Sequence, residues 1–136
     1  MNYEAFAELA DGLWDSIPAD YKHGLQGMHV LEAIKRDPDE PGLVRLGEYL
    51  SSGYPSVLGG FEGIGRHVAL YYGSFAYIAR GDPGFDWEGE VWETLLHELR
   101  HHLETLAWND DLVQEDIEYL RRYRQRVGSK EQRADS

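Results

Sequence analysis

The chain has 136 residues, 42% of them hydrophobic, which is enough for one core but not for two full domains. It contains no cysteine, so disulfides, thiolate metal sites and cysteine nucleophiles are excluded, and histidine or carboxylate side chains must bind any metal. The net charge is −12, and residues 1–120 carry 23 of the 25 acidic side chains. Because an acidic body repels a phosphate backbone, we expect no nucleic-acid partner.

The two ends of the chain carry different signals. The first seventeen residues alternate acidic and apolar side chains, without the positive segment and apolar run of a secretory signal. No segment approaches the roughly 20 apolar residues of a membrane span. We therefore expect a cytoplasmic protein without a membrane partner. Residues 121–136 hold six basic and two acidic groups, and we expect one domain over residues 1–126 followed by a flexible tail over 127–136.

Apolar spacing predicts the first elements in chain order. Three- and four-residue spacing over residues 3–17 predicts an amphipathic helix that ends at Pro18. The β-branched and apolar stretch over 28–34 predicts a strand followed by a loop. Residues 43–50 fit a short helix or an irregular segment. The glycine-punctuated part that follows leaves room only for short extended pieces near residues 57–61.

The second half of the chain changes from strand to helix periodicity. Residues 67–79 predict one long or two short strands, with a bulge or hairpin turn at Gly73 and Ser74. From Asp86, the predicted N-cap, an apolar stripe of helical period continues to Leu106, and a last helix is expected over about 112–126. This order of helix, strands, helix and helix predicts an α+β domain with a small mixed sheet.

The long helix carries the pattern His97-Glu98-Leu99-Arg100-His101. The two histidines are four residues apart, so both imidazoles point the same way and can reach one ion. They lie off the leucine stripe, on a polar face that can open to a cleft. Glu98 can act on a metal-bound water without being a ligand. The pattern predicts a Zn²⁺ site with His97 and His101 as ligands and Glu98 as catalytic base; a solvated polar face without metal is the alternative.

These residues also carry a resemblance to a known family. The doubled histidine in the HExxHH motif at 97–102, the glycine-rich segment 58–63 and the strand-like segment 67–72 resemble the minimal zincin family of small bacterial metallopeptidases. The resemblance extends from the first helix to about Leu120. It implies a single domain in which a small mixed sheet packs against the HExxH helix and flanking helices. It also implies zinc-dependent hydrolysis of peptide bonds, through a metal-activated water, in a peptide or protein substrate.

The third metal ligand departs from the family pattern. The resemblance would place a glycine at 104 and an aspartate near 107, where this chain has Glu104 and Ala107. If the chain reverses after the long helix, residues near 116 come level with His101, and Asp116 lies on the inward face of the last helix. We therefore predict Asp116 as the third ligand. Asp111 and Glu104 remain alternatives, as does a salt-bridge role for Asp116.

Two further expectations concern the surroundings of the metal. In zincins a substrate peptide lies along an edge strand, and the tyrosine-rich segment 71–77 is the candidate edge, whose tyrosines could also donate to an oxyanion. We expect His102, His29 and His67 to be packing or hydrogen-bonded residues. Because a chain of this size has little material for substrate subsites, the alternative function is a zincin-fold metal-binding or protein-interaction module with little or no turnover.

Overall fold

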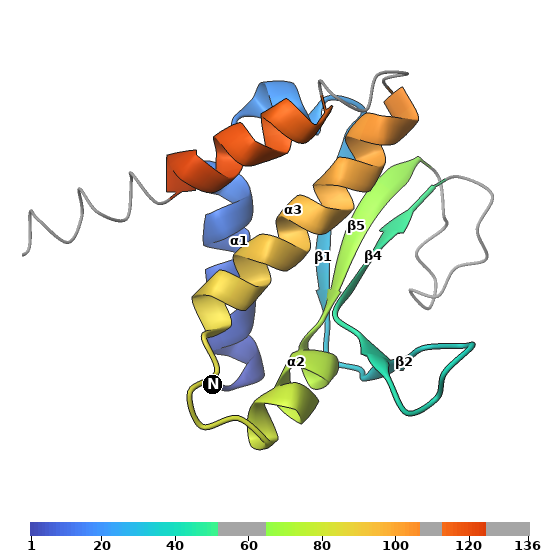
Figure 1. Ribbon diagram of the computed structural model, residues 1–136, viewed down its shortest axis with the longest axis vertical. Helices are drawn as coiled ribbons and strands as arrows, with labels where there is room; N and C mark the ends of the chain where they lie inside the picture. The colour runs from blue at the N-terminus through green and yellow to red at the C-terminus, as the bar shows by residue number, and fades with distance from the viewer. Residues whose placement is uncertain (52–64, 107–112, 125–136) are drawn as a thin grey trace, which may run out of the picture.

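The computed structural model describes residues 1–51, 65–106 and 113–124 (Figure 1). Its elements are α1 (Tyr3–Ser16), η1 (Ala19–Lys22), β1 (Leu25–Leu31), β2 (Lys35–Arg36), β3 (Val44–Arg45), β4 (Gly47–Leu50), β5 (Arg66–Tyr71), α2 (Tyr72–Arg80), α3 (Trp87–Leu106) and a helix over 113–124. The central strand β5 is parallel to β1 and antiparallel to β4, and β2 pairs with β3. The predicted α+β class and small mixed sheet are confirmed.

The first helix forms for local reasons. The Asn2 side chain accepts a hydrogen bond from the Ala5 backbone N–H at 2.8 Å and so caps α1. Phe6, Ala10 and Leu13 recur at three- and four-residue spacing and are buried. The helix ends at Ser16, just before Pro18, as the sequence predicts.

Helix α3 positions the candidate site. An oxygen of the Asp86 side chain accepts the Gly89 backbone N–H at 3.1 Å, which confirms Asp86 as the cap. The buried apolar side chains of α3 pack against α1 and the strands; they are Val91, Trp92, Leu95, Leu96 and Leu99. Figure 1 shows α3 lying across the face of the sheet beside α1. None of the helices in the described part of the chain combines the length and apolar character that a membrane span requires.

Strand β5 is buried on both faces. Val68 and Leu70 belong to the core that α1 and α3 share. Their neighbours Ala69 and Tyr71 alternate to the opposite face, where they pack with Leu50 of β4. Double burial explains why this segment is almost continuously apolar.

Two predicted elements were wrong. Residues 43–50, expected as a short helix or irregular segment, form β3 and β4, because β4 pairs with β5. The strand predicted over 67–79 ends at Tyr71, and α2 replaces its second half. The side chain of Phe75 is fully buried against Phe6 at a ring distance of 4.9 Å, so tertiary packing favours helix there. The turn predicted at Gly73 and Ser74 is the first turn of α2.

Other boundaries shift or lie outside the described residues. The strand predicted over 28–34 is β1, which begins and ends three residues earlier. The extended pieces near 57–61 and the tail over 127–136 lie outside the described residues.

Gly47 lets β4 approach α3 closely. A Cβ added at Gly47 would lie 2.9 Å from the Ala69 carbonyl oxygen and 2.9 Å from Thr94 Cγ2. We expect Gly47→Ala to lower the free energy of unfolding by about 1–3 kcal/mol, because the strand must move. The matched control is Gly12→Ala, at an exposed α1 position with nothing within 4 Å, which should stabilise the protein by about 0.5–1 kcal/mol. Urea unfolding measures both; equal effects would mean that the close approach is unimportant.

Candidate metal centre

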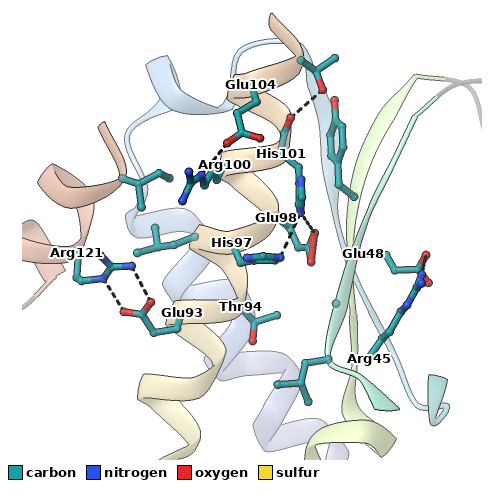
Figure 2. Close-up of a pocket in the computed structure, with 16 residues that line it drawn as sticks. Arg45, Glu48, Glu93, Thr94, His97, Glu98, Arg100, His101, Glu104 and Arg121 are labelled. Carbon is teal, nitrogen blue, oxygen red and sulfur yellow. Dashed lines mark hydrogen bonds and ion pairs between the residues drawn. The ribbon is translucent and has the colours of Figure 1, made fainter. Parts of the chain in front are cut away.

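A cleft of about 920 Å³ lies between α3, the β3–β4 segment and the helix over 113–124. In Figure 2, His97, Glu98 and His101 project from α3 toward one another on the side that carries β4. Two hydrogen bonds join the helix over 113–124 to α3 at the cleft: Arg121 donates to both carboxylate oxygens of Glu93, at 2.9 and 3.1 Å. The predicted polar face of α3 therefore opens to a cleft.

The two imidazoles of this face fit a shared metal ion. The Nε2 atoms of His97 and His101 are 3.2 Å apart. Two nitrogen ligands at the usual zinc distance of ~2.0–2.1 Å in a tetrahedral site would be about 3.3 Å apart. One ligand atom from each of His97, Glu98 and His101 lies within 4.8 Å of the others. The histidine pair predicted from the sequence thus has the spacing that a metal site needs.

Glu98 differs from the histidines in its burial. Its side chain is only 7% exposed, and its Oε1 atom lies 3.9 Å from His101 Nε2. Burial, with a smaller contribution from the Glu48 charge, raises the pKa of Glu98 to about 7. Burial, and then the neighbouring His101, lowers the pKa of His97, which favours the neutral imidazole that binds metals. A carboxyl group that titrates near neutral pH can both accept and return a proton.

The raised pKa of Glu98 predicts a pH-dependent stability of the metal-free protein. The folded state favours protonated Glu98, so this stabilisation is complete below pH ~4.5 and is lost as the pH rises through about 7. In the presence of chelator, we expect wild type to lose on the order of 1–3 kcal/mol relative to Glu98→Gln between pH 5 and pH 8. Urea unfolding of both proteins at the two pH values measures this difference. A difference that does not change with pH would show that Glu98 titrates normally.

The two candidate third ligands that the structure describes, Asp116 and Glu104, are not part of the candidate metal-binding group. The last helix runs antiparallel to α3, as predicted: Arg121 pairs with Glu93, and Arg124, further along the last helix, pairs with Glu88, which lies earlier in α3. The half-buried Asp116, however, is close enough to Tyr21 for its charge to act on it: burial, and then the Asp116 charge, raises the pKa of Tyr21.

Asp116 is not among the residues that line the cleft, whereas its neighbour Ile117 is. Glu104 lines the cleft, but its Oε1 accepts from Arg100 Nε at 2.7 Å. Asp111 lies outside the described residues. Within the described residues, the structure therefore brings together His97, Glu98 and His101 but not Asp116.

The predicted edge strand over 71–77 was also wrong. Tyr71 belongs to the central strand β5, and its hydroxyl donates to Glu48 Oε1 at 2.7 Å, on the sheet face opposite α3. Tyr72 and Tyr77 belong to α2, where the Tyr72 hydroxyl donates to the Met1 carbonyl. None of these tyrosines lines the cleft. The strand beside α3 is instead β4, at the edge of the three-stranded sheet within the described residues.

Sequence reasoning missed Tyr49, which lies on β4 and lines the cleft. Its hydroxyl is 2.9 Å from Nδ1 of His102. His102 is fully buried, and its Nε2 lies 2.7 Å from the His23 carbonyl oxygen. Burial lowers the pKa of His102. No pattern in the four-residue strand β4 marks Tyr49, because its importance comes from contact with a residue 53 positions away.

The remaining histidines pair with each other. His29 on β1 and His67 on β5 are joined through Nε2 and Nδ1 at 3.1 Å. This agrees with their expected role as hydrogen-bonded strand residues.

A helix that presents two histidines and a buried glutamate to a cleft, beside the edge strand of a small sheet, is the arrangement of the zincin class of metallopeptidases. Residues 25–121 match the zincin-like metallopeptidase family, and the chain belongs to this family.

The fold is similar to the solved structure of a conserved hypothetical protein from Thermo thermophilus, with 61% sequence identity and a TM-score of 0.67. That similarity covers 77% of this chain and 96% of the other. No curated protein matches the chain.

Proposed function

We propose that this protein is a zinc-dependent metallopeptidase that hydrolyses peptide bonds in a peptide or protein substrate. The observation that carries the proposal is the convergence of two imidazole Nε2 atoms 3.2 Å apart with a carboxyl group that is almost fully buried. Exposed carboxylates beside histidines are common on surfaces, but burying a carboxyl group costs free energy, and a group with a strongly raised pKa in a cleft is a candidate for catalysis. Its place inside an open cleft favours function.

The chain's own residues would divide the chemistry as follows. His97 and His101 would hold zinc, which when bound supplies Lewis acidity for water and for the substrate carbonyl. Glu98, which burial makes a stronger base than an exposed carboxylate, would accept a proton from the attacking water and return it to the leaving amine. Because the Glu98 carboxylate is largely shielded from water, its electrostatic effect on neighbouring groups is stronger than that of an exposed carboxylate.

The outer edge of β4, which no strand of the described residues covers, is the proposed site of the substrate backbone. The Tyr71 N–H donates to the Leu46 carbonyl at 2.9 Å, so residues 46 and 71 form a hydrogen-bonded pair. Pairs alternate along an antiparallel ladder, which turns the main-chain groups of Gly47 and Tyr49 away from β5. An extended peptide can therefore add to β4 beside α3 through these two residues.

The function is tested by zinc content and cleavage together. We expect protein purified without chelator to hold close to one zinc per chain and to cleave β-casein, an unfolded polypeptide, with loss of cleavage after chelation. Zinc without cleavage would favour the second candidate, a metal-binding or protein-interaction module. The observation that supports this candidate is the small size of the chain, which leaves little material for substrate subsites. Absence of zinc would contradict both.

Two narrower assignments stay predictions. The third ligand is the first of them: Asp116, predicted from the sequence, does not line the cleft, so we expect zinc to bind without it. The cytoplasmic location rests on the sequence alone.

A further inference from the structure

The buried histidine that follows the metal-binding pair connects three parts of the fold. Nε2 of His102 lies 2.7 Å from the His23 carbonyl oxygen, which can only accept, so Nε2 carries the proton. A neutral imidazole has one N–H, and Nδ1 must then accept from the Tyr49 hydroxyl at 2.9 Å. The ring of His102 is fully buried, so both bonds are shielded from water.

This arrangement defines what Tyr49 can do. Its single hydroxyl proton is donated to His102, so Tyr49 is not available to donate to a substrate. Its main chain, in contrast, faces the outer edge of β4. Thr105, which lies on α3 one turn beyond His101, also neighbours the Tyr49 hydroxyl. The side chain of Tyr49 is thus anchored to α3 while its backbone faces outward.

Strand β4 is fixed to α3 at two points. At Gly47 the strand approaches Thr94 so closely that a Cβ would meet Thr94 Cγ2 at 2.9 Å. At Tyr49 the strand is joined by a hydrogen bond to His102, the residue that follows His101 in α3. One of these contacts precedes the histidine pair in the sequence of α3 and the other follows it. Together they fix the distance of the short strand β4 from α3 and its direction along the helix.

We propose that His102 is a positioning residue that, through Tyr49, holds the outer edge of β4 at a set distance from His97 and His101. This inference rests on the proposed function, because the edge matters only if a substrate adds to it. If His102 only filled space in the core, any side chain with the volume of an imidazole would serve at this position. If His102 positions β4, the side chain must place a hydrogen-bond acceptor for the Tyr49 hydroxyl at the location of Nδ1.

Two substitutions at the same position separate these roles. Asparagine can place an oxygen near the location of Nδ1 and keep the acceptor for Tyr49, whereas glutamine can place an N–H near Nε2 and keep only the bond to His23. Tyr49→Phe removes the hydroxyl alone and is the variant least able to disturb folding. We expect His102→Asn to behave like wild type, and His102→Gln to behave like Tyr49→Phe.

Amide hydrogen exchange of the metal-free proteins gives a readout independent of activity. In Tyr49→Phe and His102→Gln, the Glu48 and Leu50 amides should exchange about tenfold faster, while the β1 amides change less than about threefold. His102→Asn should keep wild-type exchange at Glu48 and Leu50. Equal behaviour of the two His102 variants, or equal acceleration in β1 and β4, would overturn the proposal; so would unchanged β4 exchange in Tyr49→Phe.

Cleavage of β-casein by the zinc-loaded proteins supplies the second readout. Tyr49→Phe and His102→Gln should raise KM about tenfold, with kcat within about threefold of wild type and zinc content unchanged. A fall in kcat with unchanged KM would overturn the positioning role. If wild type itself does not cleave, the proposed function fails, while the exchange pattern still decides whether His102 holds β4.

Discussion

Glu98→Gln should abolish peptide cleavage and leave zinc binding intact. Glutamine has nearly the same shape as glutamate and fills the same buried position, but it cannot accept a proton from water. Loss of a general base costs about 10²- to 10⁴-fold in rate, so kcat/KM for β-casein should fall by at least about 100-fold. Elemental analysis should still find close to one zinc per chain, because Glu98 is not a proposed ligand.

The control for this variant is Glu90→Gln on the same helix. Glu90 is exposed and does not line the cleft, so its loss of charge should change kcat/KM by less than about threefold. If Glu98→Gln cleaves as fast as Glu90→Gln, Glu98 is not the base. If it also loses zinc, Glu98 is itself a ligand, and the assignment of roles within the group is wrong.

His97→Ala should lose the metal. The substitution leaves one imidazole of the pair, and changes to mere hydrogen-bond partners of metal ligands already cost about 10- to 100-fold in affinity. We expect zinc affinity, measured by competition with a chromophoric chelator, to fall by more than about 100-fold, with cleavage lost in parallel. Because the His97 side chain is exposed, the stability of the metal-free protein should stay close to that of wild type.

The control for metal loss is His23→Ala, which removes an exposed imidazole outside the group and keeps the backbone carbonyl that binds His102. Zinc affinity should not change. The same assay on Asp116→Asn decides whether Asp116 is the third ligand. Because Asp116 does not line the cleft, we expect zinc to be retained; a loss similar to that of His97→Ala would establish Asp116 as a ligand. Retention of zinc by His97→Ala would remove the proposed site.

The histidine pair of the candidate site could be predicted from the sequence, because the relative placement of its two residues follows from the geometry of a single helix. Four-residue spacing places His97 and His101 on one side of any regular helix, and the apolar stripe of α3 places that side away from the core. The cap at Asp86 and the whole of α1 are equally local. Such features need only neighbours within one or two turns.

Tertiary structure alone decided the rest. Residues 72–80 form a helix because Phe75 packs on Phe6, although their aromatic residues also suit a strand. Strand β4 exists because it pairs with β5, and Tyr49 matters through His102. The burial of Glu98 and the position of Asp116 outside the cleft lining likewise depend on how the elements pack against one another. The physical reason is that periodicity reports contacts within an element, whereas pairing, burial and charge environment are set between elements that are distant in the chain.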